Sequence, residues 1–125
     1  LCTSEKQYIK VLKHLKIKSN NLWVDNKANA TTHVFDNNSG ELCCVVCINV
    51  EHHNKVEVYG LLVHEAVHVW QEYVQRIGEH APGNEQMAYG IQSISQELIN
   101  EFIHKKSNYF LTKSSMSYTI FQSFS

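Results

Sequence analysis

The sequence lacks an apolar run long enough to cross a membrane. Its longest candidate, Leu42–Val50, is less than half of the roughly 20 residues that a membrane-spanning helix requires. Charge of one sign is also scarce, because 11 basic and 12 acidic residues leave a formal net charge of −1. That balance removes the long-range positive field on which non-specific nucleic-acid binding depends. We therefore expect a soluble protein that binds neither a membrane nor a nucleic acid.

Internal repeats, linkers and low-complexity blocks are also missing before the serine-rich C-terminal tail. A length of 125 residues is enough for one domain with a buried core and too short for two ordinary domains. We expect a single domain over residues 1–125. In about 106–125 we expect either a flexible tail or, because apolar residues alternate near its end, an added edge strand.

The four cysteines do not have the spacing of a disulfide framework. Three of them, Cys43, Cys44 and Cys47, lie in one β-branched stretch, where neighbouring side chains of a strand point to opposite faces. We interpret them as buried thiols in a reducing compartment. Together with the lack of a secretory signal after Leu1, this predicts a cytoplasmic location. The alternative is a second metal site at the C-x-x-C spacing of Cys44 and Cys47.

Hydrophobic periodicity predicts a helix followed by a hairpin. Ser4 is a suitable N-cap for a first helix that ends near Lys18 and carries its lysines on one solvated face. Two strand-like runs, Thr31–Phe35 and Glu41–Val50, are joined by a cluster of turn-forming residues.

Two long helices are expected after the hairpin. One runs from about Lys55 to Gly78, which is a suitable C-terminal cap, and the next runs from near Asn84 to about Lys105. The connection between them is only about six residues long, so the helices should lie antiparallel and side by side. The sequence therefore predicts an α+β fold, in which a small antiparallel sheet packs on the first long helix and the second long helix pairs with it.

Residues His64 to His68 read His-Glu-Ala-Val-His, an H-E-x-x-H pattern in the middle of the first long helix. The two histidines project from one face about 6 Å apart along the axis, so both imidazoles can reach one ion. Glu65 points to the side of the pair, where it can contact a water that the ion binds. The pattern predicts Zn²⁺ as the cofactor, His64 and His68 as ligands and Glu65 as the general base. The alternative is a pair of histidines hydrogen-bonded within the core.

A catalytic zinc ion needs a third protein ligand and one open position. Glu72 is in phase with the histidines, but it lies about 12 Å along the axis from His64. Glu85 is the better candidate, because an antiparallel second helix would bring one of its faces against the histidines. That expected face consists of Glu85, Ala88, Tyr89 and Gln92. The competing interpretation of Glu85 is a first-turn carboxylate favoured by the helix dipole, with His80 as the reserve ligand.

The H-E-x-x-H pattern followed by Glu85 resembles the gluzincin branch of the zincin metallopeptidases. More closely, the run Leu61–Phe102 is similar to small zincin-like proteins of tailed bacteriophages and prophages. The resemblance implies a minimal zincin-like domain in a bacterial host or a phage-infected cell. It also implies that His64, His68 and Glu85 bind zinc and that Glu65 is the general base.

Two positions depart from the gluzincin pattern. Tyr89 stands where these enzymes carry an aspartate that orients a histidine. They also supply a later side chain that stabilises the oxyanion, and the candidates here are Tyr89, His80 and His104, of which we nominate Tyr89 as catalytic. We expect a zinc-dependent peptidase acting on a peptide or protein laid along the Leu42–Val50 strand. The alternative is a catalytically weak or inactive binding module with the same fold.

Overall fold

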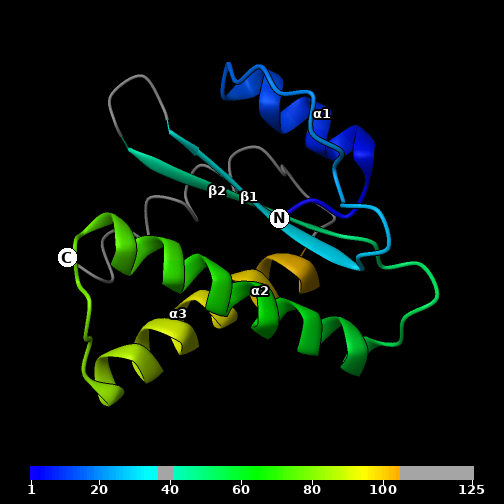
Figure 1. Ribbon diagram of the computed structural model, residues 1–125. Coiled ribbons are helices and arrows are strands. Elements are labelled where there is room, and N and C mark those ends of the chain that lie inside the picture. The colour runs from blue at the N-terminus through cyan, green and yellow to red at the C-terminus, as the bar shows by residue number, and fades with distance from the viewer. Residues whose placement is uncertain (37–40, 105–125) are drawn as a thin grey trace.

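A computed structural model describes residues 1–36 and 41–104 of the chain. The elements are helix α1 (Glu5–His14), strands β1 (Ala30–Asp36) and β2 (Leu42–Ile48), and helices α2 (Lys55–Arg76) and α3 (Asn84–Ile103). The predicted α+β class, with its strand pair and two long helices, is confirmed (Figure 1). Among the described residues, no helix is both long enough and apolar enough to cross a membrane. The tail predicted at about 106–125 lies outside these residues.

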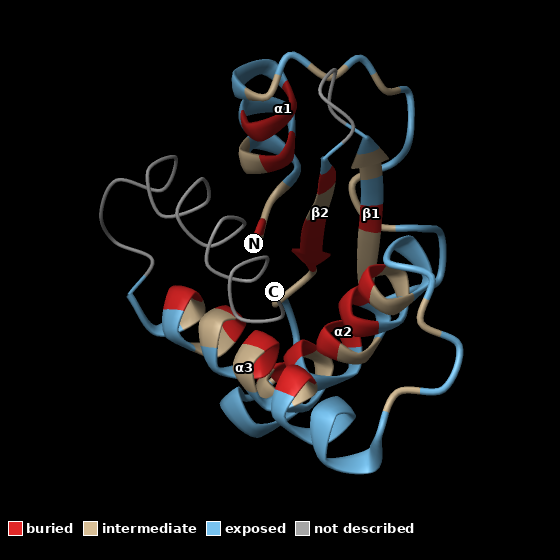
Figure 2. Cartoon of the chain, turned by 90° about the vertical axis from the view of Figure 1, so that its left-hand side faces the viewer, coloured by how far each residue is buried: buried red, intermediate tan, exposed pale blue. Residues whose placement is uncertain are grey.

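The two strands form an antiparallel sheet that separates two cores. Their register is regular along the whole pair, with Ala30 opposite Ile48. Side chains alternate between the faces, so one face packs against α1 and the other against α2 and α3 (Figure 2). Cys2 pairs with Cys47 on the far side of β2. In the described part of the chain, β2 thus has a neighbour on both sides, whereas β1 has an outer edge with no strand beside it.

Helix α1 ends at His14, before the predicted end at Lys18. Lys16 adopts a left-handed conformation with φ of 57°, and the N–H of Ile17 donates to the carbonyl of Leu12. These are features of a Schellman motif, which closes a helix. Because a lysine is an uncommon residue in this conformation, the sequence contained no signal for the earlier end.

Helix α2 has a defined start and end. Asn54 and Glu57 form a reciprocal capping box at its N-terminus. At its C-terminus Gly78 has φ of 74°, and the N–H of Glu79 donates to the carbonyl of Val74. The predicted glycine cap is therefore confirmed. The two caps define a helix of 22 residues with the H-E-x-x-H pattern near its middle.

Strand β1 lies along α2 and runs in the same direction. Thr32 donates a hydrogen bond to Glu65, and Asp36 at the end of the strand pairs with Arg76 near the end of the helix. Between these two contacts the helix rises about 16 Å and the strand spans about 13 Å, so the segments match in length. The part of β1 that carries Thr32 consequently borders the middle of α2.

Helix α3 packs on α2 through a different face from the predicted one. Ile94 and Leu98 are fully buried in the shared core, and Ile91 and Phe102 pack against it. The face expected to meet the histidines is exposed throughout; it comprises Glu85, Ala88, Tyr89 and Gln92. That prediction was wrong, because α3 instead packs its aliphatic stripe of Ile91, Ile94 and Leu98 on α2. Burying this stripe removes more apolar surface from water than burying the Glu85 face would. Met87, in the first turn of α3, is also 40% exposed.

No disulfide links the four cysteines. Cys44 faces the core shared with α2, whereas Cys47 faces the core under α1. The alternative of a C-x-x-C metal site is therefore contradicted, because the two side chains lie on opposite faces of the sheet. Burial raises the pKa of the Cys44 thiol to about 12, and the nearby Cys43 and Glu72 act in the same direction.

Candidate metal centre

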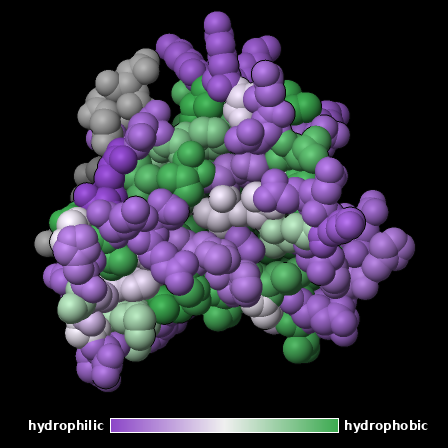
Figure 3. All heavy atoms as spheres, viewed as in Figure 1, coloured by the Kyte–Doolittle hydropathy of each residue, from purple (hydrophilic) through white to green (hydrophobic). Residues whose placement is uncertain are grey.

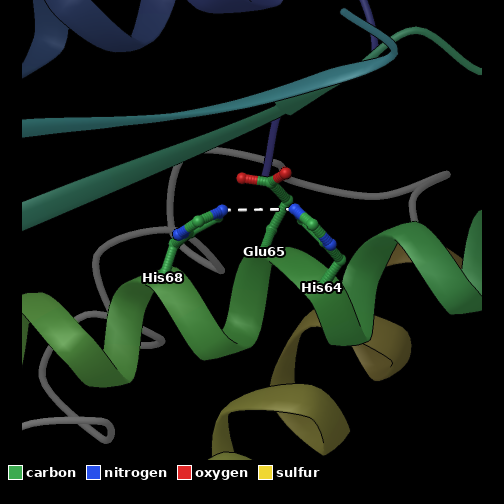
Figure 4. A group of neighbouring side chains, drawn as sticks. All are labelled: His64, Glu65 and His68. Carbon is green, nitrogen blue, oxygen red and sulfur yellow. Dashed lines mark hydrogen bonds between the residues drawn. The ribbon is translucent and has the colours of Figure 1, made fainter.

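His64 and His68 stand one helical turn apart on the exposed side of α2. Their Nε2 atoms are 3.2 Å apart and their ring planes are inclined by 73° (Figure 4). Two nitrogen ligands about 2.05 Å from a tetrahedral zinc ion are separated by roughly 3.3 Å. The separation of the two Nε2 atoms thus matches that of two nitrogen ligands of one zinc ion.

Gln71 orients His68 through the other ring nitrogen. Nδ1 of His68 lies 3.2 Å from Oε1 of Gln71. Because an amide oxygen only accepts, this contact fits the tautomer of His68 in which Nδ1 carries the proton and the lone pair of Nε2 is left for a metal. Metal-binding histidines usually donate their second ring N–H to such an acceptor. No role was predicted for Gln71, although its i, i+3 spacing from His68 is a signal that would have identified it.

Glu65 is buried, whereas the two histidines are exposed. Its side chain is only 4% exposed and lies between α2 and β1. Oε2 accepts a hydrogen bond of 2.5 Å from Oγ1 of Thr32. The ligand atoms of His64, Glu65 and His68 all lie within 4.8 Å of one another. The structure therefore brings these three predicted site residues together, with the carboxylate beside the imidazole pair.

Glu85 and Tyr89 are not part of this group. Both are exposed on α3, Tyr89 by 65%. Figure 4 shows the clustered side chains rising from α2 toward the strands, while α3 crosses behind and beneath the helix. Of the His, Cys, Asp and Glu side chains in residues 1–36 and 41–104, only Glu65 joins the histidine pair. Neither undescribed range contains any of these residue types. The ligand role of Glu85 and the catalytic role of Tyr89 stay predictions.

The outer edge of β1 offers backbone hydrogen-bonding groups beside the metal centre. The N–H of Cys2 donates to the carbonyl of Val46, so the backbone groups of Val46 point away from β1. Thr32 lies opposite Val46 in the antiparallel pair. Because the backbone groups of Val46 point away from β1, the N–H and C=O of Thr32 must point away from β2, outward from the sheet. The same holds for Val34, two residues along. Within the described chain, these outward groups have no backbone partner.

The surface that carries α2 is of mixed character. Hydrophilic and hydrophobic side chains are interspersed over this face, and no single large apolar patch covers it (Figure 3). A ligand of the metal centre would therefore be recognised more by hydrogen bonds and the histidines than by a broad apolar surface.

Comparison with protein-family models, with curated proteins and with solved structures found no match to this chain. The resemblance to gluzincins therefore stays a prediction. A functional assignment depends on the geometry of the H-E-x-x-H residues and of the strand edge beside them.

Proposed function

We propose that this protein is a zinc-dependent hydrolase that cleaves peptide bonds. The observation that carries the proposal is the pair of Nε2 atoms, 3.2 Å apart, with a buried carboxylate beside them. His64 and His68 would hold the ion through these nitrogens. Zinc at such a site supplies Lewis acidity and lowers the pKa of the water that it binds toward about 7.

Glu65 is the general base in this proposal. Its Oε2 is held by the Thr32 hydroxyl, which leaves Oε1 to accept a proton from the attacking water. The same carboxyl group can then protonate the departing amine, since an amide nitrogen is a poor leaving group without a proton. The buried position keeps the carboxylate in a fixed orientation between α2 and β1.

The substrate would be an extended peptide paired with β1. This changes the earlier expectation that the peptide lies along Leu42–Val50, because β2 is flanked by β1 and by Cys2. The outward backbone groups of Thr32 and Val34 can instead form a ladder with an added strand. A peptide in that position would pass beside His64 and His68.

A metal-containing binding module without turnover is the second candidate. It is favoured by the ligand set, since Glu65 is the only further His, Cys, Asp or Glu side chain that joins the histidine pair in the described chain. A catalytic zinc ion usually has three protein ligands.

Metal analysis combined with a peptide-cleavage screen separates the two candidates. We expect about one zinc ion per chain, and cleavage of unstructured peptides that a chelator abolishes and added zinc restores. Zinc without cleavage would support the binding module. A protein that binds no zinc after loading would contradict both.

A further inference from the structure

We propose that Thr32 is a positioning residue that keeps the Glu65 carboxylate out of the metal's coordination sphere, so that a coordination position stays open for water. This inference rests on the proposed zinc centre. It begins with the hydrogen bond from Thr32 Oγ1 to Glu65 Oε2, which at 2.5 Å is at the short end for a hydroxyl that donates to a carboxylate. A hydroxyl has one proton to donate, so this bond commits it to Glu65.

The anchor is rigid because it belongs to the sheet. Thr32 lies within the paired part of β1, opposite the buried Val46. Farther along, the strand also contacts α2 through the exposed ion pair between Asp36 and Arg76. Glu65 is thus tied to an element whose position does not depend on the metal.

The anchored carboxylate is close enough to the histidines to reach an ion that they share. Neighbouring ligands of a tetrahedral zinc ion are roughly 3.3 Å apart, which the histidine pair matches. The three ligand atoms are within 4.8 Å of one another, and the histidine pair accounts for the short separation of 3.2 Å. A carboxylate at this distance could bind either the ion or a water on the ion, and the hydrogen bond from Thr32 favours the water, because it already holds one of the two carboxylate oxygens.

Loss of the Thr32 hydroxyl would leave a buried carboxylate without its donor. Such a group is unstable unless it finds another partner, and the ion beside it is the strongest one in reach. Glu65 would then become a third protein ligand and occupy a coordination position. Zinc would bind more tightly while turnover falls. A merely structural role for Thr32 would instead weaken both.

The test compares Thr32→Val, which is nearly isosteric, with Thr32→Ser, which keeps the hydroxyl. Zinc affinity is measured by competition with a chromophoric chelator, and kcat is measured on a cleaved peptide. We expect Thr32→Val to bind zinc more tightly than the wild type and to lose about 10- to 100-fold in kcat. Thr32→Ser should stay near wild type in both. Thr31→Val is the matched control, because the Thr31 hydroxyl accepts from the N–H of Asp25, away from the site.

The source of any added affinity is checked in the Glu65→Gln background. There Thr32→Val should not tighten zinc binding, because a neutral amide is a poor zinc ligand. Should Thr32→Val fail to fold, Thr32→Ala enters the same comparison, with circular dichroism as the check on folding.

Each outcome bears on a different proposal. Zinc affinity that is unchanged or weaker in a folded Thr32→Val protein overturns the inference, even if the wild type cleaves peptides. Tighter zinc binding with no cleavage by any variant supports the inference and overturns the hydrolase proposal. Failure of both the wild type and Thr32→Val to bind zinc overturns both.

Discussion

At the scale of single residues, the site depends on the contrast between a buried carboxylate and two exposed imidazoles. Glu65 is almost inaccessible, yet it lies within reach of both histidines. Burial of a carboxylate is costly unless hydrogen bonds compensate it, and Thr32 supplies one. The position of Glu65 is therefore explained by a strand residue, while its proximity to the histidines is explained by helical spacing.

Replacement of Glu65 by glutamine tests its role as the base. We expect Glu65→Gln to retain zinc and to lose about 100-fold or more in kcat, since general-base catalysis contributes typically 10²–10⁴-fold. The amide oxygen can still accept from Thr32, so the fold should be preserved. Zinc content and kcat are measured on the same preparation, and undiminished kcat would refute the assigned role.

Replacement of Gln71 tests the orientation of His68. In Gln71→Leu the Nδ1–H of His68 loses its acceptor, so we expect zinc affinity to fall by about 10-fold. Stability should change little, because the side chain is exposed. Gln75→Leu, one turn farther along α2, is the matched control. Equal zinc affinities of the two variants in a competition titration would show that Gln71 does not orient the ligand.

At the scale of elements, the proposed substrate site depends on the position of β1 along α2. The strand is held at both ends of its contact with the helix, by Thr32 and by Asp36. Its outward backbone groups face neither β2 nor α1. In the proposed function, the candidate metal centre would therefore lie between the helix that carries the two histidines and a strand edge that could align a peptide.

A pair of proline substitutions tests the strand edge. The N–H of Val34 points outward, so Val34→Pro removes one of the proposed peptide-binding donors without breaking the β1–β2 ladder. We expect KM to rise by about 10-fold with kcat little changed. This is the result of losing an interaction that binds the substrate and the transition state equally well. Phe35→Pro is the contrasting variant, because the N–H of Phe35 points toward β2. It should lower the free energy of unfolding in urea. An unaltered KM in Val34→Pro would exclude the edge as the binding site.

At the scale of the whole molecule, the two cores hold acidic groups in their neutral form. Burial raises the pKa of Cys44 to about 12, and burial is also the main cause of the raised pKa of Tyr8 and Tyr73. Tyr8 lies in the core under α1, and Tyr73 lies in the core around α2. Both sides of the sheet therefore favour the protonated forms.

This predicts a loss of stability at alkaline pH. The unfolded thiol of Cys44 ionises near its ordinary pKa of 9.0, whereas the folded thiol keeps its proton to about 12. The folded state thus holds more protons in this range, and its stability falls as pH rises, by at most about 1.4 kcal/mol per pH unit for one group. Urea unfolding at pH 7, 9 and 10.5 should show the decline. Cys44→Ala should make it shallower, and an identical slope in that variant would assign the decline to other groups.

The sequence by itself determined the features that depend on local spacing. His64 and His68 share a face because a helix repeats every 3.6 residues, and Gly78 ends that helix because glycine adopts positive φ at little cost. Two strand-like runs joined by a cluster of turn-forming residues likewise predicted the strand pair. Each of these follows from interactions between residues close together in the chain.

Only the tertiary structure decided how distant elements meet. Thr32 reaches Glu65 across 33 positions of sequence, a contact that no local pattern indicates. The predicted approach of α3 failed because its aliphatic stripe, and not the face with Glu85, packs on α2. A helix presents one face to a neighbour, and which face it presents is set by the total apolar surface that the packed molecule removes from water.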